Sequence, residues 1–205
     1  MSSAATVLLV DDDSAIRDAM SWTLRSVGLS VESCASPDEL LRSSRPDLSG
    51  CFVIDLQLPG MNGFELQKRL RQKGCLQPFI IVSGHANVSL AVQAMHLGAI
   101  DFIEKPFNHQ LLLDSVQKAI ERDIGQRRRR ADQADIQKKL DELTDRERQV
   151  LDLVVCGELS KRIASQLRIS VKTVEAHRSN IRKKMDIDSV AQLTSLVTRL
   201  SLTAQ

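Results

Sequence analysis

The 205-residue chain lacks the long apolar segments that membrane insertion or export would require. Runs such as that from Val7 to Val10 fall far short of the roughly 18 residues that a membrane helix needs. The chain begins Met-Ser-Ser-Ala-Ala-Thr, without the basic flank and apolar core of a secretory signal. We therefore expect a cytoplasmic protein.

Cysteine is scarce, and its spacing follows no paired pattern. The chain has four cysteines and no Cys-x-x-Cys pair; they are Cys34, Cys51, Cys75 and Cys156. This spacing argues against a zinc ribbon, a disulfide scaffold and thioredoxin chemistry. We expect buried free thiols in a reducing cytoplasm.

Charge is distributed unevenly along the chain. Hydrophobic residues make up 42% of the sequence and charged residues 26%, as in a soluble protein of one large or two small domains. Residues 1–120 contain 10 basic and 13 acidic residues, whereas residues 121–205 contain 18 basic and 13 acidic residues. An acidic half before a basic half suggests a regulatory or metal-binding unit joined to a nucleic-acid-binding unit.

Short apolar runs alternate with helical patterns through residues 1–122. The expected strands are residues 6–10, 29–34, 51–55, 79–82 and 100–103. The expected helices are residues 14–26, 37–43, 64–73 and 87–97, with a fifth from about residue 109. This alternation predicts an α/β fold with a five-stranded, doubly wound parallel sheet that is covered on both faces.

A strongly charged segment, residues 123–142, interrupts this alternation. Apolar residues still recur at helical intervals, so we expect the fifth helix to continue as a long, mostly exposed linker helix with Gly125 as its weak point. A basic run such as Arg127 to Arg130 is more often a solvated face than a contact with DNA phosphates.

The remainder of the chain, residues 143–205, is expected to be all α, with four helices. Thr144 begins a capping box at the start of the first helix. Ser160 and Ser170 are the expected caps of the second and third helices, and the fourth is expected to begin at Asp188. Two helices, a short turn and a further helix have the geometry of a helix-turn-helix unit.

Polar and charged residues follow the strands of the first half where their carboxyl ends meet. They are Asp11, Asp12, Asp13, Asp55, Ser83 and Lys105. Ligands bind at this edge of doubly wound sheets. Oxygen ligands of this kind suit Mg²⁺, and a carboxylate beside Mg²⁺ can attack phosphorus to form an acyl phosphate. Capping of the following helix explains Asp13 alone, but it does not explain the other residues.

Four motifs in this half resemble the receiver domain of two-component response regulators. They are Val-Asp11-Asp12, Ile-Asp55-Leu-Gln-Leu-Pro-Gly-Met-Asn-Gly63, Val-Ser83-Gly-His and Phe102-Ile-Glu-Lys105-Pro106-Phe. The resemblance covers about residues 4–122 and implies a CheY-like fold.

The resemblance implies a phosphorylation site with a bound divalent ion. Asp55 is then the phosphoacceptor. Asp12 and Asp55 bind Mg²⁺ (or Mn²⁺) directly, together with the backbone carbonyl of Gln57, and Asp11 acts mainly through water. Gln57 stands two residues after the acceptor, where we expect it to tune the lifetime of the phosphate.

The resemblance also implies a switch around this site. Lys105 pairs with the phosphoryl oxygens, and the peptide bond before Pro106 is cis. Ser83 hydrogen-bonds the phosphate, and Phe102 follows it inward as the aromatic switch, although it lacks the hydroxyl that a tyrosine would carry. We expect the surface of helix 87–97 and the fifth strand to change on phosphorylation and to dimerise.

The basic half resembles the LuxR-type DNA-binding domain over about residues 140–203. The matching segments are Thr144-Asp-Arg-Glu-Arg-Gln-Val-Leu, Gly157-Glu-Leu-Ser-Lys-Arg-Ile-Ala164 and Ile169-Ser-Val-Lys-Thr-Val-Glu-Ala-His-Arg-Ser-Asn-Ile-Arg-Lys-Lys184. Together, the two halves resemble the FixJ/NarL class of transcription regulators, closest to the FixJ subgroup.

In that class the helix after Ser170 enters the major groove. The residues that would face base edges are Glu175, Ala176 and Ser179. Those that would meet phosphates or orient the helix are Lys161, Lys172, Thr173, His177, Arg182 and Lys183. A half-buried structural role is an equal alternative for His177. The fourth helix, around residues 190–197, would be the dimer face of the DNA-bound form.

Our main hypothesis is a phosphorylation-dependent DNA-binding transcription regulator, with activation as the commoner outcome in its class. A histidine kinase, promoter DNA and RNA polymerase are the expected partners, and a homodimer is the expected active form. The only chemistry expected is self-phosphorylation and autodephosphorylation at Asp55.

An aspartyl-phosphate phosphatase is one alternative, but Gln57 stands where its second carboxylate is needed. A regulator that ignores phosphorylation and uses the receiver fold only to dimerise is the other.

Overall fold

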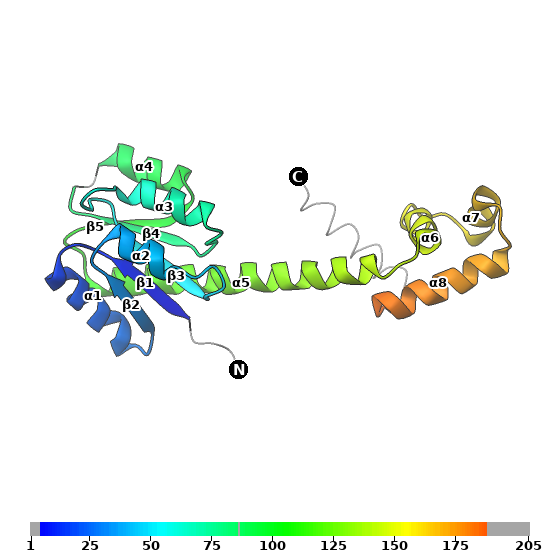
Figure 1. Ribbon diagram of the computed structural model, residues 1–205, viewed down its shortest axis with the longest axis horizontal. Coiled ribbons are helices and arrows are strands. Elements are labelled where there is room, and N and C mark those ends of the chain that lie inside the picture. Colours follow the sequence, from blue (N-terminus) through cyan, green and yellow to red (C-terminus); the bar gives the residue numbers. More distant parts are fainter. Residues whose placement is uncertain (1–4, 86, 188–205) are drawn as a thin grey trace. The chain divides into compact units, whose positions relative to one another are not determined.

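The computed structural model describes residues 5–85 and 87–187 of the chain. The chain divides into two compact units, Met1–Arg127 and Arg128–Gln205, which are described separately (Figure 1). Among the described residues, no helix combines the length and the apolar composition needed to cross a bilayer.

The first unit alternates strands with helices. Its strands are β1 (Thr6–Val10), β2 (Ser30–Cys34), β3 (Gly50–Asp55), β4 (Phe79–Ser83) and β5 (Ala99–Glu104). Its helices are α1 (Ser14–Ser26), α2 (Pro37–Ser43), α3 (Gly63–Gln72), α4 (Val88–His96) and the first part of α5 (His109–Asp141). The strands pair in parallel in the order β2-β1-β3-β4-β5, which confirms the predicted doubly wound sheet.

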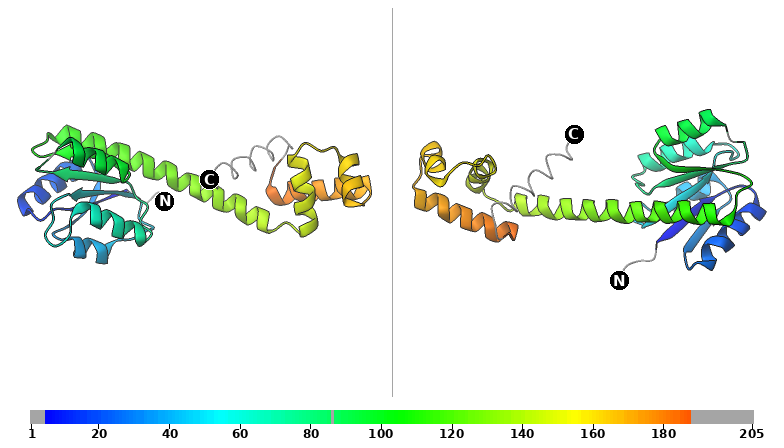
Figure 2. Two further views of the ribbon diagram at one scale, coloured as in Figure 1. Left: turned by 90° about the horizontal axis from the view of Figure 1, so that it is seen from above. Right: turned by 180° about the vertical axis from the view of Figure 1, so that it is seen from behind.

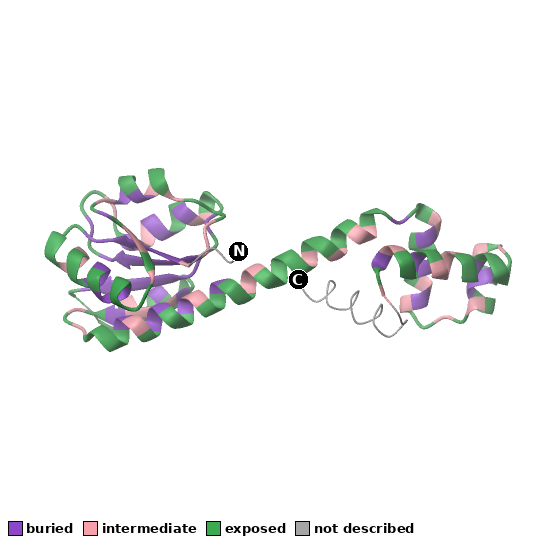
Figure 3. Ribbon diagram, turned by 90° about the horizontal axis from the view of Figure 1, so that it is seen from below, coloured by how far each residue is buried: buried purple, intermediate pink, exposed green. Residues whose placement is uncertain are grey.

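Helices cover both faces of this sheet (Figure 2). Leu40, Leu66 and Ala94, from α2, α3 and α4, pack in one hydrophobic cluster with one face of the strands. Leu24 of α1 and Val116 of α5 pack in a second cluster with the other face. Because the sheet is enclosed, all residues of β1, β3 and β4 are buried (Figure 3).

A buried carboxylate ties α5 to the start of β3. Asp123 is fully buried and accepts hydrogen bonds from the hydroxyl of Ser49, the backbone N–H of Gly50 and Nε of Arg127, at 3.0, 3.0 and 2.7 Å. The guanidinium of Arg127 also donates to the backbone carbonyls of residues 46–48. A side chain on Gly50 would not fit here, because its Cβ would lie 1.8 Å from a backbone oxygen of β1.

The prediction of one solvated face from Arg127 to Arg130 is wrong for Arg127. Arg128–Arg130 are exposed, whereas Arg127 donates its hydrogen bonds to groups of the first unit. The helix also passes through Gly125 without interruption. The beginning of the charged segment 123–142 therefore packs as part of the first unit.

The second unit is a small helical cluster. It contains α6 (Asp145–Val155), α7 (Ser160–Leu167) and α8 (Val171–Met185). Its core includes Val150, Ile163 and Val174, one from each helix, and Ile136 and Leu140 of α5 pack against this core. The expected fourth helix from Asp188, with its dimer face, lies outside the described residues.

The predicted helix caps are only partly confirmed. Thr144 and Glu147 form the capping box of α6, and the hydroxyl of Ser170 caps α8 by accepting from the N–H of Thr173 at 2.9 Å. The prediction for Ser160 is wrong. Leu159 is the N-cap residue of α7, it forms no side-chain cap, and Ser160 is the first helical residue.

The four cysteines are free, as expected, but they are not all buried. Cys34, Cys51 and Cys75 are buried in the first unit, and burial raises the pKa of Cys51 to about 12. Cys156 is exposed at the C-cap of α6, which corrects the expectation for that residue. Cys156 lies at the surface because it follows the last residue of α6, outside the periodic apolar face of that helix.

Glu147 is a buried carboxylate that joins α6 to α8. One of its oxygens accepts from Nζ of Lys184 at 2.7 Å and from the N–H and hydroxyl of Thr144 at 2.9 and 3.1 Å. The hydrogen bond from Lys184 is the main cause that lowers the pKa of Glu147, and the hydrogen bonds from Thr144 act in the same direction. The same carboxylate thus completes a helix cap and pairs a buried charge.

We expect Arg127→Met to destabilise the first unit by about 3 kcal/mol, because it leaves Asp123 as a buried carboxylate without its cation. Hydrogen-exchange mass spectrometry on peptides from β1 and β3 measures this change, and their slowest amides should exchange roughly 100-fold faster. Arg128→Met is the matched control, because Arg128 is exposed. Equal exchange in the two variants would show that the contacts of Arg127 do not stabilise the unit.

We expect Glu147→Gln to lower the stability of the second unit at pH 7 by about 1–3 kcal/mol, while a Gln can still complete the capping box. The pKa of Glu147 is lower in the folded chain than its ordinary value of 4.5. Its stabilisation is therefore present above about pH 4.5 and is lost as the pH falls through the folded-state pKa.

Calorimetric melting of the wild type and of Glu147→Gln should accordingly show a gap in melting temperature that is full at pH 7 and narrows as the pH falls below about 4.5. Asp145→Asn is the control, because Asp145 is an exposed carboxylate in the same turn. A gap that does not depend on pH would contradict the ion pair.

Candidate functional site

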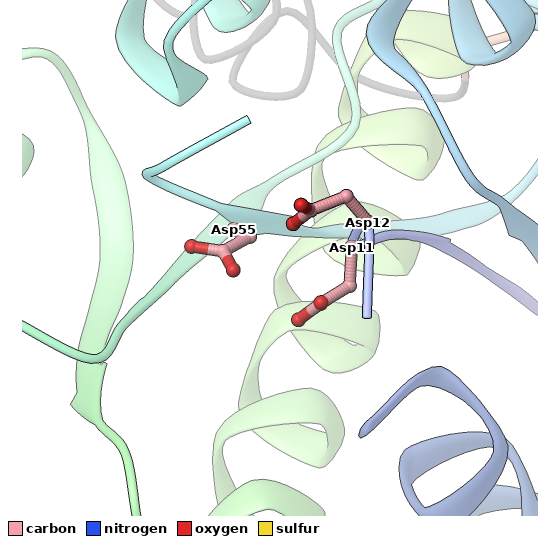
Figure 4. A group of neighbouring side chains, drawn as sticks. All are labelled: Asp11, Asp12 and Asp55. Carbon is pink, nitrogen blue, oxygen red and sulfur yellow. The ribbon is translucent and has the colours of Figure 1, made fainter. Parts of the chain in front are cut away.

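Three carboxylates meet where the strand order of the sheet reverses. Asp11 and Asp12 follow β1, and Asp55 is the last residue of β3, the strand beside it. One oxygen from each of the three carboxylates lies within 4.8 Å of the others (Figure 4). Asp11 and Asp55 are buried and Asp12 is exposed, so the cluster opens to solvent on one side.

Lys105 forms ion pairs with both buried carboxylates. Its Nζ lies 2.6 Å from Oδ2 of Asp11 and 2.6 Å from Oδ2 of Asp55. Burial is the main cause that raises the pKa of Asp11, and Lys105 opposes it. For Lys105, burial alone would lower the pKa, but the combined hydrogen bonds and charges of Asp11 and Asp55 outweigh it and raise the pKa. The site therefore holds a charged ammonium between two carboxylates.

Backbone groups fix the orientation of both buried carboxylates. Oδ1 of Asp11 accepts from the N–H of Asp13 at 3.0 Å, and Oδ1 of Asp55 accepts from the N–H of Gln57 at 2.9 Å. Asp13 itself caps α1 by accepting from two backbone N–H groups, which confirms its separate role. Gly63 packs against the end of β3, where a Cβ would lie 2.6 Å from the carbonyl oxygen of Asp55.

The other predicted pocket residues border this cluster. Ser83 is buried at the end of β4; its hydroxyl accepts from the N–H of His85 at 3.1 Å, and its carbonyl accepts from the N–H of Lys105 at 2.8 Å. The peptide bond between Lys105 and Pro106 is cis. Phe102 is half-buried and packs against the hydrophobic cluster on the α4 side of the sheet.

Two interactions at the rim were not foreseen from the sequence. Oε1 of Gln57 lies 3.0 Å from Nδ1 of His85, so a hydrogen bond joins the loop after β4 to the loop after β3, close to Asp55 in sequence. Arg17 donates to the backbone carbonyls of Asp11 and Asp12 and holds the loop after β1. The contact of Gln57 with His85 has no local sequence signal, because it depends on two loops that the sheet brings together. The partners of Arg17 lie only five and six residues before it in the chain.

The cluster has the chemistry of a site for a hard divalent cation. It offers oxygen ligands only, two of them in adjacent residues and one across the sheet, and its open side leaves room for water. Mg²⁺ fits these donors, with Asp12, Asp55 and the Gln57 carbonyl as the predicted ligands.

The second unit presents a basic helix face. Along α8, Lys172, Thr173, Glu175 and Ala176 are exposed, as are Arg182 and Lys183 further along the helix and Lys161 on α7. Ser179 and His177 are half-buried, so both alternatives for His177 stay open. Residues predicted to face DNA thus lie mainly on the accessible side of α8, while Val174 and Ile181 point into the core.

One polar contact on this face was not predicted. The hydroxyl of Ser160 donates to Oε1 of Glu175 and accepts from Nη1 of Arg178 at 2.9 Å. It joins the first residue of α7 to two residues of α8.

Comparison with known protein families assigns both units. The model of the response regulator receiver domain matches residues 7–117, and the model described as bacterial regulatory proteins, luxR family, matches residues 141–197. The chain belongs to the two-component response regulators that carry a LuxR-type DNA-binding domain, in the FixJ/NarL class.

Individual relatives align over almost the whole chain. The response regulator protein TodT of Pseudomonas putida is 37% identical over 96% of this chain and 87% of its own length. The transcriptional regulatory protein FixJ of Azorhizobium caulinodans is 38% identical over 96% of this chain and 93% of its own. The solved structure of the response regulator StyR is 37% identical, covers 96% of this chain and 100% of its own, and has a TM-score of 0.87.

These findings establish a DNA-binding transcription regulator of a two-component system, and they confirm the predicted fold and family. Such a regulator acts with a histidine kinase and with DNA. Its relatives are regulators rather than metabolic enzymes.

We expect Lys105→Met to raise the affinity for Mg²⁺ roughly tenfold, because the ammonium no longer competes for the oxygens of Asp11 and Asp55. Isothermal titration of the full chain with Mg²⁺ measures this, and Lys118→Met, at an exposed position of α5, is the control. Unchanged affinity in Lys105→Met would show that the cation binds elsewhere.

Proposed function

We propose that phosphorylation of Asp55 by a histidine kinase switches this protein into a promoter-binding dimer. The observation that carries the proposal is the arrangement of Asp11, Asp12 and Asp55 around Lys105 at the switch point of the sheet. A buried carboxylate with an ammonium beside it and an open side is prepared to accept a phosphoryl group and to balance its charge.

The transfer needs an accessible acceptor oxygen and a stabilised product. Asp55 attacks the phosphorus of the kinase phosphohistidine, the P–N bond breaks as the P–O bond forms, and the imidazole leaves. Mg²⁺, when bound, neutralises the charge that develops on the phosphoryl oxygens. Lys105 already donates to Oδ2 of Asp55 and is placed to follow the new charge.

The switch requires groups that interact differently before and after transfer. The hydroxyl of Ser83 accepts a backbone N–H here, and we propose that it turns to donate to the phosphoryl group, with Phe102 following inward. The contact of Gln57 with His85 lies beside the acceptor, where it can limit the approach of water and so set the phosphate lifetime.

We propose that α4 and β5 form the dimer face. Four apolar side chains are exposed on α4 or directly after it; they are Val88, Val92, Met95 and Leu97. Such a cluster of exposed apolar residues is typical of a protein interface. The predicted second dimer contact, on the helix around residues 190–197, lies outside the described residues.

The DNA-binding unit then inserts α8 into the major groove of promoter DNA, with RNA polymerase as a further partner and activation as the proposed outcome. Exposed cations on α7 and α8 supply phosphate contacts, and Glu175, Ala176 and Ser179 face the bases. Because its target is promoter DNA, the proposed location is the cytoplasm.

A regulator indifferent to phosphorylation is less well supported, because the acidic residues and Lys105 form a complete, interacting pocket.

We expect Mg²⁺ with beryllofluoride, a phosphoryl mimic, to double the molecular mass of the wild type and to tighten its binding to duplexes selected from a random library. Asp55→Asn should show neither response. Mass by light scattering and affinity by fluorescence anisotropy measure both effects.

Asp13→Asn is the matched control, because it removes one neighbouring charge but keeps an oxygen that can cap α1. If Asp55→Asn binds DNA as tightly as the activated wild type, with no change of mass in either protein, regulation without phosphorylation is the better account.

A further inference from the structure

Ser160 and Arg178 form hydrogen bonds that helix capping does not explain. We propose that they are positioning residues for the carboxylate of Glu175. They hold it where it can accept a hydrogen bond from the amino group of one cytosine in the major groove. This inference rests on the proposed function, since it requires α8 to read DNA.

The donors and acceptors in the contact allow one hydrogen-bond direction. The guanidinium of Arg178 can only donate, and its Nη1 lies 2.9 Å from Oγ of Ser160. A hydroxyl carries one proton, which is therefore free to point at Oε1 of Glu175. The result is a directed chain from guanidinium to hydroxyl to carboxylate, in which the cation polarises the hydroxyl toward the anion.

This chain fixes a side chain that would otherwise move freely. Glu175 is exposed and has several rotatable bonds, so holding it before DNA arrives lowers the entropy lost on binding. Ser160 donates to Oε1, and the other oxygen, Oε2, can accept a hydrogen bond from a new partner.

The chemistry of the carboxylate selects the base. A carboxylate is acceptor-only, and DNA phosphates repel it, so its favourable partner is an amino group on a base edge. Among the side-chain pairings of the major groove, Glu accepts from N4 of cytosine. A carboxylate held in one direction can discriminate that base pair from the others.

Structural stability does not account for the contact. Ile163 and Ala164 already anchor α7 in the core, and Leu159 holds the N-cap position without a side-chain bond. Ser160 is half-buried and Glu175 is exposed, and hydrogen bonds that face water add little to stability. The contact of Ser160, which is the first helical residue rather than the N-cap residue, is better explained by its partner Glu175.

The experiment compares base preference, affinity and salt dependence in the full-length protein. The wild type, bound to Mg²⁺ and beryllofluoride, selects a duplex from a random library, and each base pair of that duplex is then replaced in turn. Fluorescence anisotropy gives the affinity for every replacement.

We expect Ser160→Ala to lose about tenfold of the discrimination at a single cytosine-containing base pair, with the other positions and the slope of affinity against salt unchanged. Glu175→Gln should lose discrimination at the same base pair, and adding Ser160→Ala to it should have no further effect there. Ser160→Thr, which keeps the hydroxyl, should behave as the wild type. Ser165→Ala, at an exposed serine of the same helix, is the control.

Four outcomes would overturn the inference. Equal weakening on every duplex by Ser160→Ala would make Ser160 a phosphate contact, and a lower melting temperature with unchanged base preference would make it a structural residue. A wild type that selects no sequence at all contradicts the proposed function as well, whereas a selected sequence whose base preferences Ser160→Ala leaves intact overturns this inference alone.

Discussion

The ion pairs of Lys105 are the interaction on which the rest of the receiver depends. Parallel strands force Asp11 and Asp55 to the same edge of the sheet, and burial there makes two negative charges costly. One ammonium at 2.6 Å from each carboxylate offsets that cost and ties the loop after β5 to the ends of β1 and β3. Any new charge on Asp55 must therefore be shared with a residue of the β5 loop, which gives the proposed switch a physical route to the α4 and β5 surface.

The features that could be predicted from the sequence are those with a local or periodic cause. Apolar runs and helical patterns predict the alternation of elements, and because parallel strands end at one edge, the same patterns predict that Asp11, Asp55 and Lys105 lie together. The capping box at Thr144 is equally predictable, since its two members lie three residues apart and need no distant partner. Element ends differ from the predicted ones by about a residue, as hydrogen bonding rather than hydropathy sets them.

The features that could not be predicted depend on partners far away in the chain. The basic neighbours of Arg127 suggest a solvated face, but its guanidinium instead donates to the backbone carbonyls of residues 46–48, about 80 residues earlier in the chain. The same holds for Asp123, whose partners Ser49 and Gly50 lie more than 70 residues away. Buried polar groups require partners, but the sequence alone does not say which ones.

A local rule that fails can itself point to function. Ser160 has the residue type of a helix cap, which is worth about 1 kcal/mol to a short helix, but it stands one position after the N-cap residue Leu159. The chain forgoes that contribution in α7 and directs the hydroxyl to Glu175, a residue on the exposed face of the proposed recognition helix. Arg127 and Asp123 also break a local expectation, but their bonds serve burial and anchor α5.

The contacts of Asp123 and Glu175 differ in whether the carboxylate is buried or exposed. A buried carboxylate such as Asp123 needs its partner for stability, whereas an exposed carboxylate such as Glu175 could be satisfied by water. An exposed carboxylate that is nevertheless held by protein groups is therefore better explained by orientation toward a ligand than by folding.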